Sequence, residues 1–162
     1  MKTNVTNSKR KVDKKWTQYA EDVVSGKVAA GQYIKLSAKR FLDWFDRDDI
    51  YFNTELMNRI DKFVPQLKNF EGVWAGKPVK LLPFQRFVIA NIFGWFYKKS
   101  PVPQVKNKRV VEDALLFIAR KNGKSALTAI IAIIDLLIAN GYCNDTGVAC
   151  GYEGYCCANS LD

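Results

Sequence analysis

The sequence has no histidine among its 162 residues. Histidine is the side chain that most readily gains and loses a proton near neutral pH, and it is a common metal ligand. Its absence excludes histidine-based acid–base catalysis, serine–histidine–aspartate triads and histidine-containing metal sites. The chemistry of this chain therefore has to come from other side chains or from backbone groups.

Cysteine is scarce, and its spacing is uninformative for metal binding. The four cysteines stand at positions 143, 150, 156 and 157, and none form a pair separated by two residues. This spacing disfavours a zinc site. The N-terminus is polar and basic and does not resemble a signal peptide, so we expect reduced thiols in the cytoplasm.

Long apolar runs are also missing. The longest, Ala126 to Ala139, contains Asp135 and is shorter than the roughly 20 residues that a membrane-spanning helix needs. The sequence therefore predicts no membrane partner, and its 48% hydrophobic residues can instead form a buried core. Acidic residues are few between positions 63 and 100, where six basic residues and one acidic residue give a net charge of +5. Such an excess suits a polyanion such as DNA, and a generally basic surface accounts for it equally well.

The first part of the chain predicts helices. Residues 1–15 are basic and poor in apolar side chains, which is typical of a disordered tail. Residues 16–69 then carry three apolar stripes at helical spacing, and Asn53 is placed to cap the third helix. Residues 71–82 read as a loop, and Pro83 suits the first turn of another helix, whose apolar spacing reaches Trp95 and for which Gly94 is a plausible end. Gln85 lies near the start of that helix, where its amide could face a ligand.

The functional expectation for the rest of the chain centres on the stretch from Asp113 to Asp135. Ala114–Ile118 is an apolar run that predicts a strand buried on both faces, as in a parallel sheet. A turn follows, and Gly123-Lys124-Ser125 then opens an apolar helix. Strand, glycine turn and helix form the layout of a phosphate-binding loop. In that layout Gly123 lets backbone N–H groups approach a phosphate, Lys124 reaches the β- and γ-phosphates, and the Ser125 hydroxyl ligates Mg²⁺.

Two features of this stretch depart from the common phosphate-loop pattern. Ile118 stands where that pattern has its first glycine. Ile130–Asp135 resembles the strand whose terminal aspartate positions Mg²⁺ in P-loop ATPases. It begins only a few residues after Ser125 with no turn residue between them, so we interpret Asp135 as part of the helix. Residues 155–158 are a candidate second strand.

Several segments together resemble the N-terminal part of the ATPase region in the large terminase subunit of tailed bacteriophages. Residues 120–125, Arg-Lys-Asn-Gly-Lys-Ser, match the variant phosphate loop of that family, which commonly lacks the first glycine. The other supporting segments are Trp16–Lys27, Lys39–Leu42, Gly72–Pro78, Leu82–Gln85, Ile92–Trp95 and Tyr155–Ser160.

The resemblance implies roles and partners. Gln85 would recognise adenine, Arg120 would act on the γ-phosphate, and Lys121, Asn122 and Gly123 would hold ATP with Lys124 and Ser125. Mg²⁺ would accompany the nucleotide. The family is the motor that packages viral DNA, so the implied partners are double-stranded DNA, the small terminase subunit and the capsid portal, in the cytoplasm of a bacterial host.

The expected fold class is α/β: an N-terminal helical region followed by the beginning of a P-loop NTPase sheet, which is incomplete. The expected division is a tail over 1–15, a helical region over 16–69, and the first part of an ATPase domain over 70–162. No second acidic motif and no nuclease cluster are evident, so ATPase activity of this chain is left open. Two alternatives remain: an unrelated P-loop NTPase or kinase fragment, and a non-enzymatic basic module that binds DNA or a protein.

Overall fold

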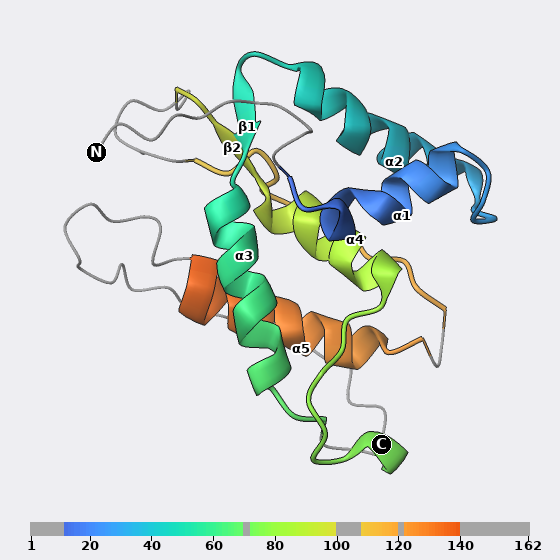
Figure 1. Ribbon diagram of the computed structural model, residues 1–162, viewed down its shortest axis with the longest axis vertical. Coiled ribbons are helices and arrows are strands. Elements are labelled where there is room, and N and C mark those ends of the chain that lie inside the picture. The colour runs from blue at the N-terminus through green and yellow to red at the C-terminus, as the bar shows by residue number, and fades with distance from the viewer. Residues whose placement is uncertain (1–11, 70–71, 100–107, 120–121, 140–162) are drawn as a thin grey trace. The chain divides into compact units, whose positions relative to one another are not determined.

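The computed structural model describes residues 12–69, 72–99, 108–119 and 122–139 (Figure 1). The chain divides into two units, residues 1–117 and 118–162, and each is described by itself. Within the first unit, α1 packs against α2 and α4, and α3 also contacts α4. The α-helices of this unit are α1 (Lys14–Val24), α2 (Gln32–Asp43), α3 (Thr54–Phe63) and α4 (Pro83–Phe93). Short 3₁₀ turns are η2 (Trp44–Asp46), η3 (Val64–Gln66) and η4 (Gly72–Trp74).

The helices of the first unit confirm the apolar stripes in the sequence. Helix α3 begins after Asn53, whose side-chain oxygen accepts the Leu56 N–H at 3.0 Å, as a capping residue should. Leu56, Met57 and Ile60 are fully buried on one face of that helix. Helix α1 begins two residues before Trp16, because Asp13 caps it by accepting the Lys15 N–H at 3.0 Å.

A two-stranded antiparallel sheet joins two distant segments of the first unit. Strand β1 (Ile50–Phe52) pairs with β2 (Trp95–Tyr97) in the register Ile50 to Tyr97. The sequence favoured Gly94 as the end of the fourth helix, and this is confirmed: α4 ends at Phe93 with Gly94 as its cap. Trp95, which also lies at helical spacing in the sequence, begins β2 instead of continuing the helix. The physical reason is the strand partner, since β1 supplies backbone bonds that the sequence pattern does not contain.

Phe41 lies at the centre of an aromatic core that ties this sheet to the helices. Its ring, which is fully buried, meets four others edge-on, with centroids 5.4–6.0 Å apart. Edge-to-face contacts of this kind stabilise a core beyond the area they bury. The four partner rings are Phe45, Phe52, Phe87 and Trp95.

The strand expected over Ala114–Ile118 does not form. Residues 111–119 have no helix or strand, and the side chains of Leu115 and Phe117 are 92% and 100% exposed. A parallel strand needs neighbouring strands and covering helices. The second strand that we predicted, over 155–158, lies outside the described residues. The described part of the chain is thus mixed helix with a small antiparallel sheet, consistent with an incomplete α/β fold.

Candidate nucleotide-binding site

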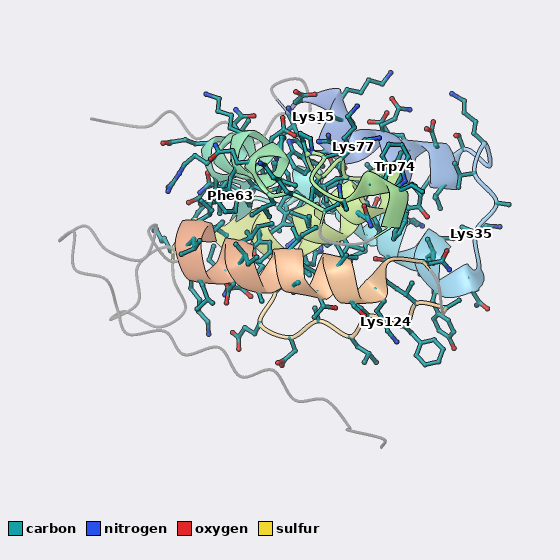
Figure 2. All side chains as sticks on the ribbon, turned by 90° about the horizontal axis from the view of Figure 1, so that it is seen from below. Lys15, Lys35, Phe63, Trp74, Lys77 and Lys124 are labelled. Atoms are coloured by element: carbon teal, nitrogen blue, oxygen red, sulfur yellow. The ribbon has the colours of Figure 1, made fainter. Side chains whose placement is uncertain are left out.

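Gly123 adopts the backbone conformation that a phosphate-binding turn requires. Its φ of 67° and ψ of 26° are left-handed, a region that glycine enters without steric cost. Helix α5 (Lys124–Ile134) begins at the next residue. The side chains of Asn122, Lys124 and Ser125 are exposed, and Figure 2 marks Lys124 in the first turn of α5. The sequence therefore places its lysine and serine at an accessible helix N-terminus.

The first turn of α5 has backbone donors to offer. Leu127 N–H donates to the Gly123 carbonyl at 2.9 Å and closes the first turn of the helix. The preceding amides have no carbonyl one turn earlier in the helix to which they could donate. Gly123 has no side chain with which to cap them, and the helix dipole adds a partial positive charge at this end. This arrangement suits an anion such as a phosphate group.

Helix α5 continues beyond Ser125 without a turn. Asp135 ends the α-helical part, and Asp135–Ala139 follow as a π-helical turn. The structure thus confirms that Asp135 is a helix residue rather than the end of a strand. The apolar residues Leu127, Ile130 and Ile134 lie at helical spacing and are buried. The run Ile130–Asp135 is therefore part of a packed helix.

Gln85 lies in the first turn of α4 and is half-buried. Its Oε1 accepts the Leu82 N–H at 2.8 Å, so the side chain caps the start of its own helix. A carbonyl oxygen has two lone pairs, so Oε1 keeps one further acceptor position, and the two N–H groups of the amide are donors. The sequence did not predict this cap, although glutamine at the third helical position after a proline start is a recognisable signal.

Two site residues predicted from the sequence, Arg120 and Lys121, lie outside the described residues. Gln85 belongs to the first unit, and Asn122 to Ser125 belong to the second. Within the described ranges, no group of three or more histidine, cysteine or acidic residues could hold a metal ion, and no helix is long and apolar enough to cross a membrane.

A left-handed glycine followed directly by lysine and serine at a helix N-terminus is typical of proteins that bind nucleotide phosphates. Residues 83–152, which include this turn and Gln85, match the family model for the terminase large subunit, ATPase domain. For this part of the chain, the match confirms the resemblance seen in the sequence. No curated protein and no solved structure gives a significant match to the chain.

Proposed function

We propose that this chain binds ATP with Mg²⁺ through the turn and first helical residues of α5. The observation that carries the proposal is the left-handed Gly123 directly before exposed Lys124 and Ser125, inside the segment that matches an ATPase family. Lys124 supplies the cation for the β- and γ-phosphates, and the amides of the first turn supply the backbone donors. Lys121 and Asn122 complete the loop.

Ser125 suits the metal that accompanies the nucleotide. Ser125 is exposed in the first turn of α5, and its hydroxyl is the kind of hard oxygen ligand that Mg²⁺ prefers. One protein hydroxyl fits a site in which phosphate oxygens and water provide the other ligands. When bound, the metal neutralises charge on the phosphates. Arg120, in the same loop, would stabilise the charge that develops on the γ-phosphate.

Gln85 would recognise the base. Adenine presents a donor and an acceptor side by side at N6 and N7, and an amide side chain can accept from one and donate to the other. The helix cap leaves Gln85 with one acceptor position and two donors for that purpose. Base recognition and helix capping are therefore compatible in one side chain.

At the level of the whole protein, we propose a role in the motor that packages viral DNA into a capsid. The match of residues 83–152 to the terminase ATPase family model and the basic stretch before the proposed phosphate loop support it. Its partners would be double-stranded DNA, the small terminase subunit and the capsid portal, within the bacterial cytoplasm.

Replacing Lys124 tests ATP binding most directly. Lys124→Ala should weaken the affinity for ATP-Mg²⁺ by at least about ten-fold, because a charged hydrogen bond to the phosphates is lost. Isothermal titration measures it. Lys35→Ala is the matched control, since Lys35 is also an exposed lysine near the start of a helix (Figure 2). Equal affinities for the parent and Lys124→Ala would refute the proposal.

A further inference from the structure

Three helices of the first unit meet at the carboxylate of Asp61. Asp61 belongs to α3, and its Oδ1 accepts a hydrogen bond from Arg86 Nη1 of α4 at 2.6 Å. Its Oδ2 accepts one from Lys15 Nζ of α1 at 2.7 Å. All three side chains are largely covered, with 28–30% of each exposed. One carboxylate therefore connects the first turns of α1 and α4 to α3.

A buried ring lies beside the two cations. Trp16 is fully buried, with the Lys15 ammonium 5.9 Å and the Arg86 guanidinium 5.7 Å from its ring centroid. Lys15 also forms an ion pair with Asp13, the capping residue of α1, at 2.8 Å. Cation–π contacts and shared hydrogen bonds restrict both long side chains. This cluster therefore holds its helices more firmly than an exposed ion pair would.

The position of Arg86 gives Asp61 a specific effect on α4. A cation in the first turn of a helix faces the positive end of the helix dipole, which disfavours it. The first turn of α4 contains no acidic residue that could offset this repulsion. Asp61, from another helix, supplies the missing negative charge at this point.

Gln85 is the residue immediately before Arg86. Its own hydrogen bond, to Leu82 N–H, fixes the amide relative to the helix start. Asp61 fixes the helix start relative to the rest of the first unit. We propose that Asp61 is a positioning residue for adenine recognition: through Arg86 it holds the first turn of α4, and hence the Gln85 amide, where the base is read. This inference rests on the proposed function of Gln85.

The test compares ligands with and without a base. The affinities for ATP, GTP and inorganic tripolyphosphate are measured for the parent, Gln85→Ala, Asp61→Asn and the double variant. Gln85→Ala should lower the ATP/GTP affinity ratio by roughly 5- to 150-fold. Asp61→Asn should lower it by about five-fold, with tripolyphosphate affinity unchanged. In the double variant, Asp61→Asn should add little to the loss caused by Gln85→Ala, since both act through one amide.

Two further variants serve as controls. Arg86→Lys should keep the ATP/GTP ratio near that of the parent, because Arg86 gives Asp61 one hydrogen bond that an ammonium can replace. If Asp61→Asn does not fold, as judged by circular dichroism, Arg86→Gln is the second variant, because it removes the cation through which Asp61 acts. It should lower the ATP/GTP ratio, and an unchanged ratio in folded Arg86→Gln contradicts the inference. Asp49→Asn, which removes the exposed ion pair with Arg47, should change nothing.

The remaining outcomes separate this inference from the proposed function. An unchanged ratio in Asp61→Asn, additive losses in the double variant, or an equal loss of tripolyphosphate affinity overturns the positioning role alone. An unchanged ratio in Gln85→Ala overturns both the adenine role of Gln85 and this inference. If Lys124→Ala is the only variant that loses tripolyphosphate binding, the proposed phosphate site is supported whatever the ATP/GTP ratios of Asp61→Asn and Gln85→Ala are.

Discussion

At the scale of single residues, Asp61 has two hydrogen bonds that only folding could create, because its partners are distant in sequence. Partial burial opposes its ionisation, but hydrogen bonds from Lys15 and Arg86 and the charges of both hold the pKa of Asp61 below its usual value. A lowered pKa means that the folded state favours the carboxylate more than the unfolded chain does. Its contribution to stability is therefore present above the ordinary aspartate pKa and is lost as the pH falls through the folded-state pKa.

This linkage predicts how Asp61→Asn changes stability with pH. At pH 7 the variant should be less stable than the parent by about 1–3 kcal/mol, because two cations lose a charged acceptor. The difference should shrink as the pH falls below the ordinary aspartate pKa of about 4, because the unfolded parent chain then takes up a proton at Asp61 more readily than the folded state does. Urea unfolding followed by circular dichroism at pH 7, 5 and 3 measures it. A difference that is the same at all three pH values would contradict the assignment.

Between elements, Gly94 is the residue that allows α4 to meet β1. A Cβ at this position would overlap the Phe52 ring of β1 and would lie 2.5 Å from the Ala90 carbonyl oxygen. The Gly94 carbonyl also accepts the Asn53 N–H at 2.7 Å, next to the cap of α3. Its φ of −80° is ordinary, so glycine is required here by close packing and not by backbone conformation.

Substitution at Gly94 should therefore destabilise the first unit. Gly94→Ser should lower the free energy of unfolding by about 1–3 kcal/mol, the usual cost of overpacking a core. Gly31→Ser is the matched control: a Cβ there meets no atom within 4 Å, and serine is a favourable residue at the start of α2. Thermal melting of the two variants and the parent gives the comparison. Equal melting temperatures for both variants would show that the Phe52 ring can move aside at no cost.

For the whole molecule, the question is whether this chain alone can use ATP. Hydrolysis needs a carboxylate to orient the attacking water and to help hold Mg²⁺. Four acidic residues follow the loop, and only Asp135 is in the described part of the chain, where it lies within a helix. Arg120 could stabilise charge but could not replace that carboxylate.

We therefore predict that the 162-residue chain binds ATP but releases phosphate far more slowly than about 10 s⁻¹, a typical enzyme turnover. It should also leave plasmid DNA uncut, because two-metal nuclease chemistry needs several converging acids. Phosphate release and plasmid cleavage with Mg²⁺, with and without DNA, measure both activities. Rapid turnover that disappears in Asp135→Asn would show that the helix residue is catalytic after all, and turnover lost only in Glu153→Gln would place the acid elsewhere.

Local patterns determined most of the helices and the glycine turn before α5. Asn53 caps α3, Pro83 begins α4, and Gly123 takes a left-handed conformation, because capping, proline geometry and glycine freedom act within a few residues. The family resemblance was also readable from the sequence, since each of its motifs is a short contiguous segment.

Long-range contacts decided the rest. The pairing of β1 with β2, the close approach at Gly94, and the meeting of Lys15, Asp61 and Arg86 join residues that are distant in sequence. The apolar run 114–118 illustrates the limit of local patterns, because its pattern predicted a strand that does not form. A helix closes its hydrogen bonds within its own segment, so a local pattern can specify it, whereas a strand exists only where other segments supply partners.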